Sequence, residues 1–262
     1  MTTTKTEVPR HPAKYSASIL DALFDIADAE ADRKGEGLLI LDPFAGVGLI
    51  HKLVEHGHQT YGVELEHEWA AAHERTEVGN ALALEYKTGA FDAVITSPTY
   101  GNRLADHHEA KDACKQCAGT GLQTGSEVPC KNCRGSGLSK RNTYRHALGR
   151  PLSDGSSAVM QWGTEYREFH YEAWVESIRV IKPAGLLVVN TSNHIRKRAE
   201  VPVAEWHLHT IINLGCRIEE VRRVVTPRNR EGANGDNRVE GELVIVARTP
   251  SPRTPGHPVL FA

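Results

Sequence analysis

LLILDPFAGVG, from Leu38 to Gly48, is an apolar run that ends in a carboxylate and a glycine turn. The run predicts a buried strand, and the turn predicts a close approach of the backbone to a ligand. TYGVEL, from Thr60 to Leu65, reads as a second strand that carries Glu64. An acid about 20 residues beyond such a turn can accept hydrogen bonds from ribose hydroxyls. The turn contains few glycines and is preceded by an aspartate. These two features favour a ligand with a cationic amino-acid end over a ligand with a pyrophosphate. The alternative is an ordinary strand-to-helix turn with no ligand.

Apolar runs and helical spacings alternate along most of the chain. Helices are expected over 15–33, 49–59, 66–78, 166–185 and 203–215. Ser16 or Ser18 is expected to cap the first of them. Further strands are expected over 91–100, 186–193, 217–227 and 241–248. This alternation predicts an α/β fold with a mostly parallel, doubly wound sheet. The last two strands, joined by a loop, predict an antiparallel hairpin that closes the sheet.

Composition limits the class of protein. With 262 residues, 40% of them apolar, the chain can bury one large core or one core with an inserted module. A formal net charge of -2 gives no overall basic character, so a nucleic-acid surface would have to be local. The sequence has no apolar run of membrane-spanning length, and MTTTKTEVPR lacks the apolar core of a signal peptide. We therefore expect a cytoplasmic protein with no membrane partner.

Three motifs, in this order, resemble those of class I adenosylmethionine-dependent DNA methyltransferases. Residues 10–15, RHPAKY, resemble a His-Pro-Ala-Lys stretch that precedes the cofactor turn, and LDPFAGVG resembles that turn. TSPTY, residues 96–100, resembles the Asp/Asn/Ser-Pro-Pro-Tyr/Phe signature of methyltransferases that modify amino groups of bases. The resemblance covers most of the chain outside its cysteine-rich stretch. It implies a Rossmann-like fold with a seven-stranded sheet.

The resemblance also implies roles for particular residues. The residues expected to bind adenosylmethionine are His11, Pro12, Lys14, Asp42, Phe44, Gly46, Gly48, Glu64, Asn80 and Ala81. Ser97 and the carbonyl of Pro98 would accept hydrogen bonds from the target amino group, and Tyr100 would stack on the base. The amino nitrogen needs such acceptors because its lone pair is delocalised into the ring. The target base must then be single-stranded or flipped out of the duplex. Thr99 departs from the signature, in which a second proline occupies this position.

The cysteine-rich stretch repeats one unit, Cys-x-x-Cys-x-Gly-x-Gly. Its cysteines are Cys114, Cys117, Cys130 and Cys133. Four thiolates can close a tetrahedral zinc site, with a redox dithiol as the alternative. The units resemble those of DnaJ-type zinc domains, and two units imply one structural zinc. We therefore expect a small zinc-ribbon-like module over 103–150, inserted into a catalytic domain formed by 1–102 and 151–262.

Two other cysteine patterns have simpler interpretations. A carbon-methylating enzyme would need a cysteine nucleophile, which usually follows proline. Pro129-Cys130 is the only such pair, and it belongs to the second metal unit. Cys216 is expected to be a buried core thiol.

Cations outnumber acids in the expected insert. They are Arg103, Lys111, Lys115, Lys131, Arg134, Lys140, Arg141, Arg145 and Arg150. The acids are Asp106, Glu109, Asp112 and Glu127. This excess is typical of a module that contacts phosphates, although a solvated surface insert is the alternative. A second basic loop contains Arg228 and Arg230.

These features together predict an enzyme that methylates an exocyclic amino group of a base, N4 of cytosine or N6 of adenine, in DNA. Its cofactors would be adenosylmethionine and zinc. One alternative is an RNA guanine amino-methyltransferase, although no separate RNA-binding domain is visible in the sequence. The other is a zinc-stabilised nucleic-acid-binding protein whose methyltransferase fold is inactive, for which Thr99 is the best argument. The sequence predicts no oligomeric state.

Overall fold

The computed structural model describes residues 8–12, 15–102, 113–133, 135, 137–138, 144–226 and 239–251. Several residues singled out in the sequence lie outside the described residues: Lys14, Arg103, Asp106, Glu109, Lys111, Asp112, Arg134, Lys140, Arg141, Arg228 and Arg230.

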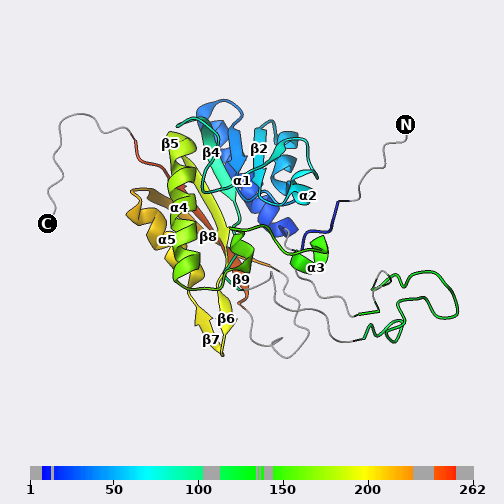
Figure 1. Cartoon of the computed structure of the whole chain (residues 1–262). Coiled ribbons are helices and arrows are strands. Elements are labelled where there is room, and N and C mark those ends of the chain that lie inside the picture. The colour runs from blue at the N-terminus through cyan, green and yellow to red at the C-terminus, as the bar shows by residue number, and fades with distance from the viewer. Residues whose placement is uncertain are drawn as a thin grey trace, which may run out of the picture.

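Seven strands form one sheet in the order β3-β2-β1-β4-β5-β9-β8 (Figure 1). They are β1 (Leu39–Asp42), β2 (Gln59–Glu64), β3 (Thr76–Val78), β4 (Phe91–Thr96), β5 (Ile181–Thr191), β8 (Arg217–Val225) and β9 (Gly241–Arg248). The first five run parallel, whereas β9 pairs antiparallel with both β5 and β8. This is the Rossmann-like fold of class I methyltransferases, and the predicted fold class is confirmed.

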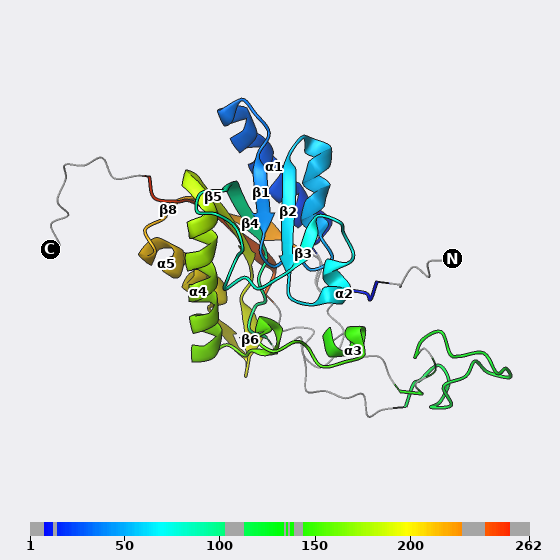
Figure 2. The same ribbon diagram turned by 45° about the horizontal axis from the view of Figure 1, so that its top comes forward.

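Helices cover both faces of the sheet. They are α1 (Ala17–Lys34), the 3-10 helix η1 (Leu49–His56), α2 (His67–Ala70), α3 (Tyr144–Leu148), the 3-10 helix η2 (Ser157–Val159), α4 (Thr164–Val180) and α5 (Val203–Asn213). Figure 2 shows α4 and α5 on one side of the sheet and α1 on the other. Ser16 caps α1 as expected, since its hydroxyl accepts a hydrogen bond from the backbone N–H of Ile19.

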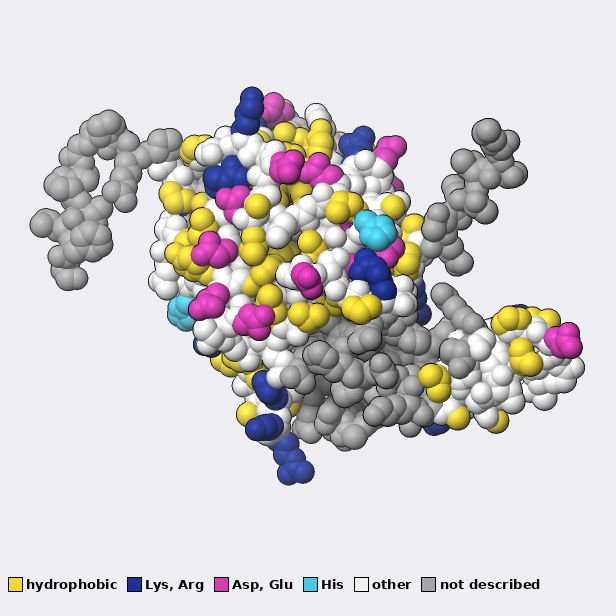
Figure 3. All heavy atoms as spheres, in the orientation of Figure 1, with side chains coloured by type: hydrophobic (Ala, Val, Ile, Leu, Met, Phe, Trp, Pro, Cys, Tyr) yellow, Lys and Arg dark blue, Asp and Glu magenta, His cyan; other side chains and the backbone are white. Residues whose placement is uncertain are grey.

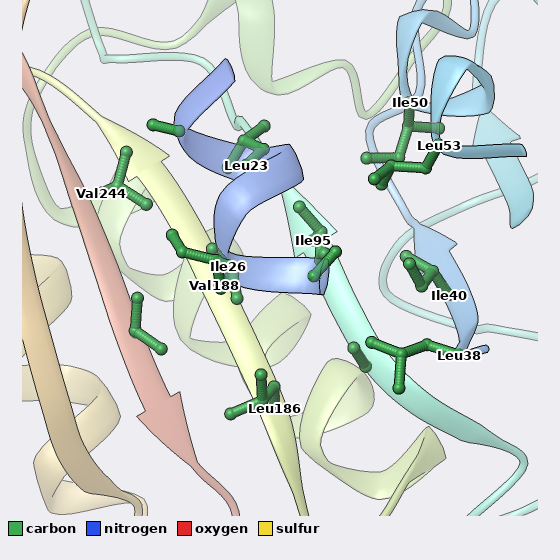
Figure 4. Close-up of a cluster of buried hydrophobic side chains, with 14 of the residues drawn as sticks. Leu23, Ile26, Leu38, Ile40, Ile50, Leu53, Ile95, Leu186, Val188 and Val244 are labelled. Atoms are coloured by element: carbon green, nitrogen blue, oxygen red, sulfur yellow. The ribbon is translucent and has the colours of Figure 1, made fainter. Parts of the chain in front are cut away.

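Alternate residues of β5 enter two separate cores. Leu186 and Val188 join Leu23 and Ile26 of α1 in the first core (Figure 4). Leu187 and Val189 belong to the second core with residues of α4 and α5, among them Trp174, Ile211 and the buried thiol of Cys216. Because both faces of β5 are covered, residues 186–189 form a continuous apolar run that does not alternate with polar residues. The expected core position of Cys216 is confirmed.

The segment 66–78 differs from the expected single helix. Only α2 is helical, and the chain then turns so that Thr76 pairs with Gly62 as the start of edge strand β3. Pairing with the sheet overrides the helix propensity of the two alanines between them, because propensity is a weak preference beside tertiary contacts. The helix expected over 49–59 is present as the 3-10 helix η1.

The Pro-Ala-Gly stretch also differs from its expected role as the end of a helix. Helix α4 ends at Val180, and 182–185 already lies within β5 as an irregularity in its pairing with β4. Ala184 has a left-handed backbone there, with φ of 58°. Pro183 fits because proline in a sheet is tolerated where the ladder is interrupted.

A second, two-stranded sheet was not expected from the sequence. Strands β6 (His194–Arg196) and β7 (Ala199–Val201) form an antiparallel hairpin after β5. The turn between them consists of Lys197 and Arg198.

Residues 113–138 stand apart from the sheet and its helices in Figure 1. They begin with the bridge of Ala113 to Leu138 and contain a second bridge of Leu122 to Pro129. By contrast, α3 lies near the end of the expected insert, 103–150, and packs on the body, where Tyr144 joins an apolar cluster with Trp69. None of the helices that the structure describes is long and apolar enough to cross a membrane.

Candidate functional site

A cavity of about 390 Å³ opens at the carboxyl ends of β1, β2, β4 and β5. It is lined by most of the residues that the resemblance marked for cofactor binding: His11, Pro12, Phe44, Gly46, Glu64, Asn80 and Ala81. The expected catalytic residues Ser97, Pro98 and Tyr100 line the same cavity. Two predicted residues, Asp42 and Gly48, are not among its lining residues. The structure therefore brings the three separate motifs to one concave site.

The glycine turn forms one wall of the cavity. Gly46 and Gly48 have left-handed backbones, with φ of 55° and 74°. A Cβ on Gly46 would lie 3.3 Å from Nε2 of His11, and one on Gly48 would lie 2.7 Å from Cδ2 of His51. Both positions thus require glycine, for backbone conformation and for space.

Asp42 holds the start of the glycine turn through buried hydrogen bonds. Its carboxylate is fully buried and accepts hydrogen bonds from the hydroxyl of Thr96 at 2.6 Å, the backbone N–H of Phe44 at 3.0 Å and the hydroxyl of Tyr15 at 3.4 Å. Burial raises its pKa to about 6, although these donors oppose the shift. In this arrangement Asp42 fixes the start of the turn, and any effect on a ligand is exerted through the loop.

Glu64 faces the cavity at the end of β2. One carboxylate oxygen accepts the backbone N–H of Gly46 and the other that of Glu66, both at 2.9 Å. Burial raises the pKa of Glu64 to about 7, and the charges of Glu66 and Asp42 add to the shift against the two N–H donors. Because the folded protein holds this proton more tightly than the unfolded chain, Glu64 costs stability as pH rises from 4.5 through 7. A bound donor that favours the ionised form would offset this cost.

We expect the affinity for adenosylmethionine to depend on pH through Glu64. The ionised carboxylate can accept two ribose hydroxyls, so the dissociation constant should rise about tenfold between pH 8 and pH 6 for a group with a pKa of about 7. Isothermal titration across this range measures the effect. Glu64→Gln should bind more weakly and lose most of the pH dependence. A Glu64→Gln variant with the wild-type pH profile would contradict the assignment.

Aromatic rings line the cavity next to the glycine turn. The imidazole of His11 packs edge-on against Trp69, with 4.4 Å between ring centroids, and lies 5.2 Å from the ring of Tyr144. Nε1 of Trp69 is buried without a hydrogen-bond partner among the described residues. The three rings are tilted against one another and make an apolar wall, and the sequence motifs gave no sign of Trp69 or Tyr144.

Four polar side chains meet at the tip of β4. The hydroxyls of Ser97 and Tyr100 are 3.1 Å apart, and Tyr100 donates to Glu242 at 2.9 Å. The amide Nδ2 of Asn190 lies 3.2 Å from Oγ of Ser97 and 2.7 Å from Oε2 of Glu242. Oδ1 of Asn190 is buried and has no partner within the described part of the chain. A buried acceptor without a partner is rare in proteins and calls for a functional explanation.

Sequence reasoning missed Asn190 and Glu242. Asn190 follows four apolar residues of β5, and Glu242 opens the apolar strand β9. A polar residue in an otherwise buried strand was the available signal, since such a residue needs a partner or a function.

Thr99, which departs from the amino-methyltransferase signature, is well anchored. Its hydroxyl contacts the hydroxyl of Ser157 at 3.0 Å and the carbonyl of Ser157 at 3.2 Å. Its own carbonyl accepts the hydroxyl of Tyr166 at 2.6 Å. These bonds hold the loop after β4 as a proline would through its fixed φ, so Thr99 does more than supply backbone shape.

The four clustered cysteines are brought together as the sequence predicted. All four side chains are buried, and their sulfur atoms lie within 4.8 Å of one another. The Sγ atoms of Cys117 and Cys133 are 3.6 Å apart, close to the edge of about 3.8 Å expected for a tetrahedron with Zn–S bonds of about 2.3 Å. Cys130 belongs to this group, so it is not placed as a nucleophile beside the cavity.

The two cysteine units are related by a local pseudo-twofold arrangement. The N–H of Cys114 donates to the carbonyl of Gly137 at 2.8 Å, and that of Cys130 donates to Gly121 at 2.7 Å. A Cβ on Gly121 would lie 2.4 Å from the carbonyl oxygen of Gly135, which explains why the repeat needs glycine. The donor set, with four sulfurs and no oxygen or nitrogen ligand, suits one zinc ion.

The described basic residues of the expected insert fall into two groups. Lys115 and Lys131 are exposed on the cysteine hairpins. Arg150, in contrast, pairs with Glu66 at 2.7 Å and with Glu68 through two hydrogen bonds. Arg150 thus fastens the chain to α2 and is not available to a phosphate.

No family model matches the chain, and no curated protein matches it in sequence. Solved structures match it in fold. The [4+2]-cyclase SpnF is 14% identical with a TM-score of 0.49, covering 94% of this chain and 88% of its own. An adenosylmethionine-dependent methyltransferase from Methanosarcina mazei is 13% identical with a TM-score of 0.47, covering 83% of this chain and 94% of its own.

A geranyl diphosphate C-methyltransferase from Streptomyces coelicolor A3(2) is similar at 12% identity and a TM-score of 0.47, covering 88% of this chain and 79% of its own. Such values leave activity and substrate open, so the fold assignment rests on the order and direction of the strands. By that order, the chain has the Rossmann-like fold of class I methyltransferases, with a four-cysteine insert after its fourth strand.

Proposed function

We propose that this protein is an adenosylmethionine-dependent methyltransferase that modifies an exocyclic amino group of a base in DNA. The observation that carries the proposal is the polar cluster of Ser97, Tyr100 and Asn190, which lines the same cavity as the glycine turn and Glu64. A cofactor site and a set of acceptors for an amino group therefore share one space.

The cavity suits the cofactor in size and chemistry. Its volume lies within the range of about 300 to 1,000 Å³ found for small-molecule sites. Glu64 would accept the ribose hydroxyls, the backbone at Gly46 would approach the methionine end, and the rings of His11 and Trp69 would cover one side. When bound, adenosylmethionine supplies an electrophilic methyl group on a sulfonium.

The residues at the tip of β4 would then prepare the target nitrogen. The hydroxyl of Ser97 and the carbonyl of Pro98 accept its two N–H bonds, which draws its lone pair out of conjugation with the ring. Asn190 holds Ser97 by donating to its hydroxyl, and the carboxylate of Glu242 lies nearby to stabilise positive charge on the methylated amino group. Pro98 is buried at the strand end, so its carbonyl is held rigidly.

The four-cysteine module has a structural and a binding role in this proposal. Four thiolates from Cys114, Cys117, Cys130 and Cys133 would hold one structural zinc. The module would present Lys115 and Lys131 to the phosphates that flank the target base. We propose 103–150 as the insert and 1–102 with 151–262 as the catalytic domain, with the last part of the insert, Tyr144 and Arg150 included, anchored on the catalytic domain.

A methyl-transfer assay on DNA and on RNA tests the function. The purified protein is incubated with methyl-labelled adenosylmethionine and with DNA or RNA, and the nucleosides are then analysed by mass spectrometry. We expect a methylated amino group on cytosine or adenine from DNA. A methylated guanine amino group from RNA would support the RNA alternative. Adenosylmethionine binding without methyl transfer to either polymer would contradict the proposed activity.

A further inference from the structure

The hairpin of β6 and β7 carries an exposed cationic tip. Arg196, Lys197 and Arg198 are consecutive and all exposed. In Figure 3 the Lys and Arg side chains gather at this tip, at the lower end of the molecule, while acids are scattered over the body above it. Neither Lys197 nor Arg198 forms a hydrogen bond or ion pair with any residue that the structure describes.

The turn of this hairpin uses residues that its backbone disfavours. Lys197 and Arg198 have φ of 51° and 65°, so the two-residue turn is of type I′. This turn type favours Asn-Gly, because a Cβ is strained in the left-handed region. Lys197 and Arg198 cost stability in this turn and also expose two charges. This combination indicates that their side chains serve a function.

Several contacts fix the hairpin relative to the cavity. The hairpin follows β5 directly, after the cavity residue Asn190. The imidazole of His194 hydrogen-bonds the backbone of Tyr100. Arg196 donates to Gln161 at 3.0 Å, and Gln161 forms a bridge with Asn102 on the cavity wall. The cationic tip is therefore held in a fixed place beside the proposed base pocket.

We propose that Lys197 and Arg198 bind the phosphodiester backbone of the nucleic acid whose base enters the cavity. This inference rests on the proposed function. Strands of three residues carry the tip about 10 Å beyond the base of the hairpin. We expect the tip to contact phosphates that flank the target base.

The test is the salt dependence of binding to a mixed-sequence DNA duplex, with an RNA duplex of the same sequence as a second arm. Lys197→Gln/Arg198→Gln removes two phosphate contacts, so the slope of log affinity against log salt should fall by about 1.8. Between about 50 and 200 mM salt this makes a difference of about twelvefold. The control Lys52→Gln/Lys87→Gln removes two exposed cations from elsewhere on the body and should keep the wild-type slope.

A second variant separates charge from turn geometry. Lys197→Asn/Arg198→Gly installs the favoured turn, so it should unfold at a higher temperature than wild type and still lose the same slope. Unchanged slopes in both hairpin variants, with DNA methylation intact, would overturn the hairpin assignment alone. If the wild type neither binds nor methylates DNA or RNA yet binds adenosylmethionine, the proposed function and this inference both fail. A reduced slope on RNA alone would keep the hairpin assignment and make RNA the source of the backbone.

Discussion

Ser97→Ala is expected to lower turnover by about a hundredfold while leaving the affinity for adenosylmethionine nearly unchanged. Loss of one hydrogen-bonding group that acts mainly in the transition state typically costs about 10² to 10³ in rate. Ser97 lies at the tip of β4 among Tyr100, Asn190 and Glu242, away from Glu64 and the glycine turn. Its loss should therefore appear in kcat and not in cofactor binding. Single-turnover kinetics and isothermal titration measure the two quantities separately.

Ser97→Asn is the matched control, because an amide oxygen also accepts a hydrogen bond and asparagine occurs at this position of the signature. It should recover part of the lost rate. Asn190→Ala should lose turnover as well, since Ser97 would then lack the donor that orients it. If Ser97→Ala keeps the wild-type kcat while a Cys130→Ser variant that remains folded forms no methylated product, a carbon-methylating mechanism must replace the proposed one.

Cys114→Ser is expected to release zinc, unfold residues 113–138 and weaken DNA binding by tenfold or more. The only buried cluster that the structure describes in this segment consists of the four cysteines. Leu122, Val128 and Leu138 are all exposed. Because structural zinc contributes about 10 to 16 kcal/mol of binding energy in small domains, the segment has no other source of comparable stability. Metal analysis, amide hydrogen exchange and DNA titration at fixed salt test the three effects.

Cys216→Ala is the matched control, since it removes a buried thiol from the main core and should keep one zinc per chain. Adenosylmethionine binding should survive in Cys114→Ser. A wild-type protein without zinc, or a Cys114→Ser variant that binds DNA as tightly as wild type, would contradict the metal assignment.

The sequence predicted the parts of the site that depend on short, local patterns. The glycine turn, Glu64 and the Ser97 tetrapeptide each follow a strand, and strand ends of a parallel sheet meet at one edge. The spacing of the four cysteines likewise predicted that their side chains form one cluster. These features need only the order of the elements and the chemistry of a few adjacent residues.

The parts that the sequence did not predict depend on tertiary contacts. Asn190 and Glu242 gain their role because β5 and β9 are neighbours, although they are distant in sequence. Edge strand β3 forms where the sheet offers a partner, against local helix propensity. Asp42 was assigned to the cofactor from its place in the motif, but the sequence did not show that its carboxylate is buried among donors from three different segments. The hairpin of β6 and β7 lacks the Asn-Gly signal that would have revealed it.

The anchoring of α3 has a consequence for protein engineering. Tyr144 and Arg150 fall within the proposed insert of 103–150 but are anchored on the body, since the first packs on Trp69 and the second is bonded to Glu66 and Glu68. A cassette exchange should therefore retain everything from Tyr144 onward and replace only the chain between Asn102 and Tyr144. Cut at these points, the four-cysteine hairpins can be exchanged for another segment without rebuilding the cluster of Tyr144 and Trp69 that lines the cavity.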